Sequence, residues 1–363
     1  MSIKYKNNGA WLKSPNTINI IQKTDIPEEA FNITGDCMYR FSNGWEWFIR
    51  DYGSKITTKD IRTATNMFKN LQVEKIPFDI NCVSKDYVDT AYLFSGCSIK
   101  SVPKVVCKPS STTYMFQGCG YLRNIPEDFN NGFDWSYIDS QTSAYSGSRS
   151  NMFYSCYSLR SIPMNFLEHG NPIINTSYAY FNGGFNECVS LDELVELPLP
   201  FTADYTSNLF NYSFIKCSRL KNLTFALDPD TNAPYVMRWK AQTIDLSQYV
   251  GYVDTYGAGF VINYNSGITN DTLVYDDASY QALKDNPDYW TKVLKYSRYN
   301  HDSAVETINS LPDTSAYLAT DGGTNTIKFK GDSGSATDGG AINTLTAEEI
   351  AVATAKGWTV TFA

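Results

Sequence analysis

Hydrophobic positions in the middle of the chain recur in one phrase. It is (Met/Leu)-Phe-x-x-Cys-x-x-Leu-x-x-(Ile/Val/Leu), usually followed by Pro, and its clearest copy runs from Met152 to Pro163. Phe, Cys and Leu at three-residue steps place one apolar stripe on a short helical or 3₁₀ turn. The aliphatic residues ahead of the proline predict a short buried strand that the proline ends. Such a repeated phrase is typical of stacked units that share one core.

Six copies of the phrase align on their phenylalanine. The aligned residues are Phe68, Phe94, Phe116, Phe153, Phe185 and Phe214, and five copies carry a cysteine three residues later, namely Cys97, Cys119, Cys156, Cys188 and Cys217. We predict that these eleven side chains form the repeat core, with each cysteine acting as a compact hydrophobe. The interval between copies varies, from 22 residues after Phe94 to 37 after Phe116, so several turns must carry loops.

The phrase resembles the BspA-type leucine-rich repeat and the related Met-Phe-x-x-Cys repeat of bacterial surface proteins. This resemblance implies an α/β fold, a leucine-rich-repeat-like solenoid with an N-terminal docking module and a capped C-terminal end. We expect the docking or cap module at 1–60 and the solenoid at 61–226. An irregular continuation with two short helices, near Asp277 and Asn286, is expected at 227–300, and helix–strand turns with a cap at 301–363.

Both ends carry recognisable local signals. The aromatic run from Trp45 to Ile49 predicts a strand in the N-terminal module. Ser303–Glu306 and Thr346–Glu349 fit capping boxes that open two helices. Strands are expected at Thr326–Lys330 and Trp358–Phe362, with Gly357 ending the helix before the second strand.

Charge and composition exclude several classes of function. The net charge is −8 and no basic cluster occurs, so no nucleic acid is expected as a partner.

No apolar run reaches membrane-spanning length, and the N-terminus shows no apolar leader. We therefore expect no membrane insertion, and we expect the protein to assemble in a reducing cytoplasm. With two His and no CxxC pair, neither a metal nor another cofactor is expected. A calcium ion at Asp332 and Asp338 is the minor alternative, because the EF-hand spacing is absent.

Motifs of catalysis are missing from the sequence. There is no Gly-x-Ser-x-Gly, no P-loop and no dinucleotide fingerprint, and neither His169 nor His301 lies in a nucleophile motif. We therefore expect no enzyme. A glycosidase needs two facing carboxylates, for which Glu127-Asp128 and Asp192-Glu193 are candidates by residue type alone.

Aromatic residues gather in two insertions between copies of the repeat. Trp135 and Tyr137 follow the third copy, and Tyr178 and Tyr180 follow the fourth. Insertions in repeat proteins map to loops on one face, which is often the binding face. Tyrosine and tryptophan join a rigid ring to a polar tip, which suits protein and sugar contacts. These four residues are therefore the predicted receptor contacts.

The two ends extend the resemblance. The opening from Lys4 to Trp11 resembles the openings of phage fibre and virion surface proteins, and the ending from Leu345 to Val360 resembles C-termini found with these repeats in Bacteroidetes and their phages, crAss-like phages included. The resemblance implies a virion structural protein, fibre-like or tail-associated, that presents a host-recognition scaffold. The implied partners are other virion proteins (portal, capsid or tail hub), a host-surface glycan or protein, and further copies of the chain, with a trimer favoured. The alternatives are a bacterial cell-surface or secreted adhesin and a capsule-degrading glycosidase.

Replacing Trp135, Tyr137, Tyr178 and Tyr180 together with Ser tests the predicted contacts. We expect weaker adsorption to host cells, because the aromatic contact area is lost, while the chain stays folded by circular dichroism. Unchanged adsorption would remove the two insertions as the contact surface.

Overall fold

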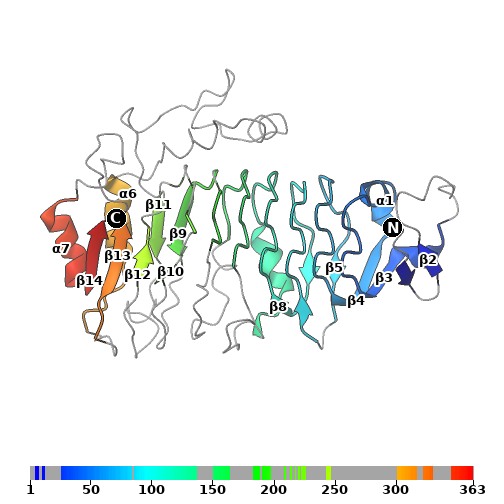
Figure 1. Cartoon of the computed structure of the whole chain (residues 1–363), viewed down its shortest axis with the longest axis horizontal. Coiled ribbons are helices and arrows are strands. Elements are labelled where there is room, and N and C mark those ends of the chain that lie inside the picture. The colour runs from blue at the N-terminus through cyan, green and yellow to red at the C-terminus, as the bar shows by residue number, and fades with distance from the viewer. Residues whose placement is uncertain are drawn as a thin grey trace, which may run out of the picture.

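The protein is elongated, with successive turns of the chain stacked along one axis (Figure 1). The computed structural model describes residues 26–83, 86–136, 150–163, 183–188, 190–197, 301–316, 322–329 and 345–362. It also describes short pieces at 5–7, 10–12, 208–209, 213–214, 217, 220, 222–225 and 243–246.

Strands are short and the helices lie toward the two ends. The strands are β1 (Tyr5–Asn7), β2 (Ala10–Leu12), β3 (Asn32–Asp36), β4 (Thr57–Thr63), β5 (Ile80–Asn81), β6 (Val88–Asp89), β7 (Val105–Val106), β8 (Pro109–Ser111), β9 (Glu193–Leu197), β10 (Asn208–Leu209), β11 (Asn222–Phe225), β12 (Thr243–Asp245), β13 (Asn325–Phe329) and β14 (Trp358–Phe362). The α-helices are α1 (Glu46–Tyr52), α6 (His301–Ser310) and α7 (Ala347–Ala355), and 3₁₀ helices span Glu28–Phe31, Gly53–Lys55 and Glu127–Gly132.

The repeat phrases around Phe68, Phe94 and Phe116 fold as a series of tight turns rather than as the expected helical turn. Around Phe68, the amides of Met67, Lys69 and Leu71 each donate to the carbonyl three residues earlier, at 3.0–3.1 Å. The residues two before and two after Phe68, Asn66 and Asn70, have φ of 57° and 59°. A residue with positive φ at the third position is the mark of a type II turn and interrupts a right-handed helix.

The backbone of each turn is hydrogen-bonded to the next turn. Phe68 N donates to Leu93 O at 3.0 Å, Asn66 N to Ala91 O at 3.1 Å, and Asn70 N to Ser95 O at 2.7 Å. The same three positions donate to the following turn around Phe94 and Phe116. Gly96 occupies one of these positions with φ +71°, and a Cβ there would overlap Asn70 Oδ1, so glycine at this position leaves room for the Asn70 side chain of the preceding turn.

Phenylalanine rings form one continuous stack through the core. Neighbouring ring centroids lie 5.5–6.3 Å apart with interplanar angles of 1–18°. The order is Phe31, Phe48, Phe41, Phe68, Phe94, Phe116, Phe153, Phe185 and Phe214. All nine rings are buried. Offset-stacked pairs contribute about 0.5–1.5 kcal/mol each beyond the burial of apolar area.

The five cysteines of the repeat, which we call the cysteine column, form hydrogen bonds as well as filling space in the core. Each thiol donates to the phenylalanine carbonyl of the preceding turn, as Cys97 Sγ does to Phe68 O at 2.9 Å and Cys156 Sγ to Phe116 O at 3.0 Å. Cys119, Cys188 and Cys217 repeat the contact at 3.0–3.1 Å. Burial raises the pKa of the Cys119 thiol to about 12, so the proton that it donates is retained. Each thiol is therefore the second donor to a buried carbonyl that already accepts the backbone N–H three residues after it.

Strands follow the repeat only in part. β9 and β11 pair in parallel and carry Leu194 and Leu223, as the phrase predicts. In earlier copies the segment before the proline is not a strand, and β5 and β7 pair just after Pro77 and Pro103. Before those prolines the turns share isolated bonds, such as Lys100 N to Glu74 O at 2.8 Å, instead of a ladder.

The N-terminal region belongs to the stack. β3 pairs in parallel with β4, and Phe41 stacks on Phe68, so the expected boundary at residue 60 falls inside β4.

The predicted strand at Trp45–Ile49 is wrong, because Trp45 is the N-cap of α1 and the residues after it lie in that helix. Trp45, Phe48, Ile49 and Tyr52 have the i, i+3, i+4, i+7 spacing of a helix, and their side chains close the end of the core.

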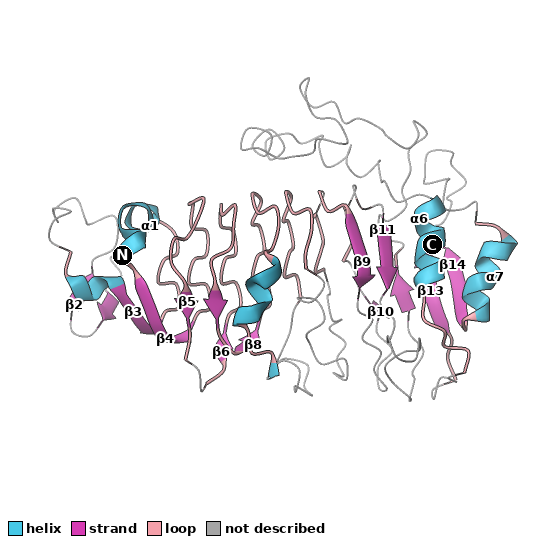
Figure 2. Ribbon diagram, turned by 180° about the vertical axis from the view of Figure 1, so that it is seen from behind, coloured by secondary structure: helices cyan, strands magenta, loops and turns pink. Residues whose placement is uncertain are grey.

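At the other end, helices alternate with parallel strands. β13 pairs with β14, Thr326 opposite Thr359, in a sheet ordered β10-β12-β13-β14 (Figure 2). Thr346 and Glu349 form the expected capping box of α7, and Gly357 follows it with φ +80°. The box at Ser303 is wrong, because α6 already includes His301 and the Ser303 carbonyl accepts from Thr307 Oγ1. The helices expected near Asp277 and Asn286 lie outside the described residues.

Phe153→Ala tests the ring stack. We expect a loss of about 3–5 kcal/mol in the free energy of unfolding, because the ring is fully buried between Phe116 and Phe185. Chemical denaturation measures the loss. Tyr87→Ala is the control, since Tyr87 is 51% exposed and should change stability by about 0.5 kcal/mol at most. A loss below about 1 kcal/mol for Phe153→Ala would show that the stack is not a stabilising core.

Candidate functional site

The predicted contact at Trp135 is wrong, because this side chain belongs to the core. It is 4% exposed, and its ring stacks on Phe133 with centroids 5.0 Å apart. The indole Nε1–H donates to Asn130 Oδ1. Phe133 in turn packs on Phe129, which meets Phe116 of the stack. Aromatic residues in an insertion can extend a core as well as form a surface, and sequence alone did not separate the two. The Ser variant that tests the predicted contacts should therefore keep Trp135 and change Tyr137, Tyr178 and Tyr180 alone, because loss of the buried indole would destabilise the fold.

The other sequence candidates divide between core and exposed positions. Tyr137, Tyr178 and Tyr180 lie outside the described residues, as do Asp332, Asp338 and His169. All eleven predicted repeat-core side chains are at most 1% exposed. Glu127 and Asp128 begin a 3₁₀ helix with exposed side chains, and Glu193 on β9 accepts from Asn222 Nδ2 at 3.3 Å.

Within the part of the chain that the structure describes, no three His, Cys, Asp or Glu side chains lie close enough to hold a metal ion. Among the same residues, no helix is long and apolar enough to cross a bilayer.

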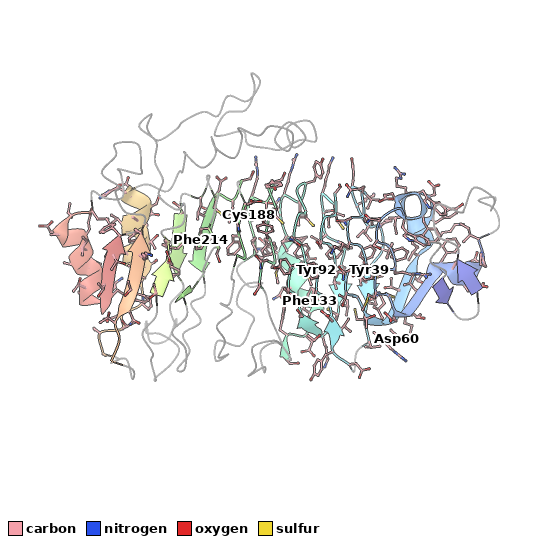
Figure 3. The ribbon with its side chains drawn as sticks, viewed as in Figure 1. Tyr39, Asp60, Tyr92, Phe133, Cys188 and Phe214 are labelled. Atoms are coloured by element: carbon pink, nitrogen blue, oxygen red, sulfur yellow. The ribbon has the colours of Figure 1, made fainter. Side chains whose placement is uncertain are left out.

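A row of tyrosines is the most distinctive surface feature of the described turns. Tyr39, Tyr92 and Tyr114 each stand two residues before a stacked phenylalanine, and we call them the tyrosine row. Figure 3 labels Tyr39 and Tyr92. Each donates its backbone N–H to the next turn, to Thr65 O, Thr113 O and Ser150 O. Tyr39 is 43% exposed, and Tyr92 and Tyr114 are half-buried.

The tyrosine row occupies backbone positions that tyrosine does not favour. All three residues have φ of 57°. Asn66, Asn151 and Gly183 hold the same position in other turns, with φ of 57°, 54° and 64°. A left-handed conformation costs an ordinary side chain roughly 1–2 kcal/mol, whereas asparagine and glycine tolerate it well. Tyrosine at this position therefore gives up stability that asparagine would keep, and such departures gather at functional sites.

The rings of the row interact with one another and with a cation. Tyr92 and Tyr114 stack with centroids 4.7 Å apart and planes 8° from parallel. Lys69 Nζ lies 4.9 Å from the centre of the Tyr92 ring, in cation–π range. Burial, and to a smaller extent the neighbouring Tyr114, raises the pKa of Tyr92, so its hydroxyl stays protonated at neutral pH. Tyr92 and Tyr114 thus present two rings that are held against each other.

Sequence reasoning missed the tyrosine row although its signal is present. The copies can be aligned on the six stacked phenylalanines from Phe41 to Phe185. The residues two places before these phenylalanines are, in order, Tyr39, Asn66, Tyr92, Tyr114, Asn151 and Gly183. Asn and Gly in a column indicate a left-handed backbone. That column would have marked the three tyrosines as exceptions.

Comparison with protein-family models, with curated proteins and with solved structures gives no match.

One ionisable contact joins the last two helices. His301 Nε2 lies 3.0 Å from Glu349 Oε2, and His301 Nδ1 lies 3.2 Å from Asp302 Oδ1. The Asp302 contact raises the pKa of His301 most and Glu349 adds to the rise, while partial burial opposes both. Glu349 also accepts from Thr346 N at 2.7 Å, which together with His301 lowers its pKa. Protonated His301 thus forms an ion pair, which we call the His301 tie, between α6 and the capping-box residue Glu349 of α7.

His301→Gln tests this tie. A raised folded-state pKa means that protonated His301 stabilises the fold fully below its unfolded value of about 6.5, and this stabilisation is lost as pH rises through the folded pKa. The melting temperature of the wild type should therefore exceed that of the variant at about pH 5.5, and the gap should shrink toward about pH 8.5. Glu348→Gln, on the exposed side of α7, should leave the profile unchanged. A gap that is constant across this range would contradict the tie.

Proposed function

We propose that this chain is a leucine-rich-repeat-like solenoid and a structural protein of a bacteriophage virion, fibre-like or tail-associated, that presents a recognition surface to the host. The observation that carries the proposal is the continuous phenylalanine stack with its inter-turn hydrogen-bond ladder. A core that runs along one axis makes a stiff rod, and a rod holds surface residues of successive turns in a fixed row. That arrangement suits display better than catalysis.

The cysteines favour the virion over a secreted adhesin. All eight are buried free thiols, and the five of the repeat column donate hydrogen bonds to carbonyls. Disulfides are typical of proteins that mature outside the cytoplasm, whereas free thiols agree with folding inside the host cell, where virions assemble. The adhesin remains the second candidate on the repeat phrase alone. No described residue supports a glycosidase specifically.

The proposed partners follow from the two ends of the rod. Attachment to portal, capsid or tail hub would use one end, and a homo-oligomer, with a trimer favoured, would place several rods around one axis. The antiparallel hairpin β1–β2 precedes the first turn, and α7 with β14 completes the last one (Figure 1). The sides of the rod are then left for a host-surface glycan or protein.

Quantitative mass spectrometry of purified virions tests the proposal. We expect the chain in gradient-purified particles at a fixed copy number, because a structural component has a set stoichiometry, and that number separates a head fibre from a tail component. Antibody labelling in electron microscopy supplies the position. A chain that is absent from particles but present in the envelope of the producing cell would contradict the proposal and favour the adhesin.

A further inference from the structure

We propose that the tyrosine row is a binding site for a glycan chain that lies along successive turns of the stack. The proposal deepens the recognition role above and rests on it for its biological setting. Its physical basis is separate, namely the rings of Tyr39, Tyr92 and Tyr114, their backbone strain and the polar groups beside them.

The first step of the argument is that the fold does not need tyrosine at these positions. Asn66 and Asn151 hold the same backbone angle in the turns between and beyond the three tyrosines. Asn66 N makes the same bond to the following turn, to Ala91 O at 3.1 Å, that Tyr92 N makes to Thr113 O at 3.0 Å. Because asparagine satisfies the turn with less strain, the backbone of the turn does not call for tyrosine, and what tyrosine adds there is an aromatic ring at the surface.

The second step concerns what the rings offer. A sugar ring has a face of C–H groups and a rim of hydroxyls, so it is bound by a flat aromatic surface with polar groups around it. Tyr39 presents such a surface at the N-terminal end of the row. Half-exposed Tyr92 and Tyr114, stacked on each other, form a rigid pair two turns further along. Tyrosine places this area with little loss of side-chain freedom.

The neighbouring positions are polar and only weakly charged. Thr65 and Thr113, three residues before a stacked phenylalanine, and Gln117, one residue after, are all half-buried. Lys69 is the cation placed against the row, over the Tyr92 ring. Thr65 Oγ1 already donates to Asp89 O at 3.3 Å, and Gln117 Oε1 accepts from Ser95 Oγ at 3.4 Å. The Thr65 oxygen can still accept from a sugar hydroxyl and the Gln117 amide nitrogen can still donate to one, and the lysine suits a carboxylate or sulfate substituent.

The surroundings fit a glycan better than a protein. A stable protein interface buries about 800 Å² on each partner and has an apolar centre. The large hydrophobic side chains exposed in the described residues are scattered, and Met38 is the one that adjoins the row. A narrow surface whose tyrosines stand in three of four successive turns fits a polymer with a repeating unit. The negative net charge of −8 makes the Lys69 neighbourhood a local exception rather than part of a general anion-binding surface.

The test is a triple variant, Tyr39→Asn, Tyr92→Asn and Tyr114→Asn, in the full chain. Wild type and variant are applied to an array of purified bacterial capsular and O-antigen polysaccharides, neutral and anionic, and the strongest binder is titrated by calorimetry. We expect saturable binding by the wild type and a loss of about tenfold or more in the variant, because the aromatic area is removed. Tyr87→Asn changes an exposed tyrosine that directly precedes β6 and is not one of the row positions; it is the matched control and should bind like the wild type.

Stability separates binding from folding. The triple variant should melt within about 3 °C of the wild type, because asparagine is native to the same column. A single variant, Tyr39→Asn, supplies a folded alternative if the triple variant unfolds, and it should weaken binding without affecting the Tyr92–Tyr114 pair.

The outcomes show separately whether the tyrosine row is a binding site and whether its ligand is a glycan. Binding of no polysaccharide by the wild type overturns the proposal, and so does binding that the variant retains. Row-dependent adsorption to host cells that survives enzymatic removal of surface glycans would assign the site to a protein partner instead. If the polysaccharide binds but the chain is absent from virions, the glycan site stands and the virion role fails.

Discussion

The structure depends on one constraint, that neighbouring turns approach closely enough for their backbones to share hydrogen bonds. The approach sets the 5.5–6.3 Å spacing of the phenylalanine rings and brings each cysteine thiol to the carbonyl of the preceding turn. It also fixes the residues around each phenylalanine, since left-handed positions two before and two after it turn the chain sharply. Asparagine and glycine fill most of these positions, and Gly96 shows how little room is left.

The sequence predicts an interaction well when the residues that form it are close together in the sequence or recur at a fixed offset. The core column is predictable because Phe and Cys recur at a fixed offset, and each side chain performs one role in every turn. The capping box at Thr346 is predictable because its hydrogen bonds join residues three apart. By contrast, the place of Trp135 depends on Phe133 and Asn130, whose positions are set by the fold of an insertion. No local pattern distinguishes that tryptophan from an exposed one.

The N-terminal region illustrates a different kind of failure. Its aromatic run was expected to be a strand on the strength of residue type, yet the spacing of Trp45, Phe48, Ile49 and Tyr52 is helical. Phe41 was overlooked as a member of the stack, because its turn lacks both the cysteine and the following leucine. Aligning copies on backbone conformation brings it in, since Tyr39 has the same φ of 57° as Asn66, Tyr92 and Tyr114 in later turns, and Asn43 also has a positive φ, of 23°.

The direction of the hydrogen bonds between turns has a mechanical consequence. These bonds, and the ring contacts beside them, join one turn to the next along the long axis (Figure 1). Tension applied between the two ends therefore loads noncovalent contacts, one interface at a time, and the turns would separate by peeling from whichever end yields first. A force applied across the axis is instead carried by the covalent chain within a turn. Pulled lengthwise, a rod built in this way would lengthen by one released turn of the chain at a time.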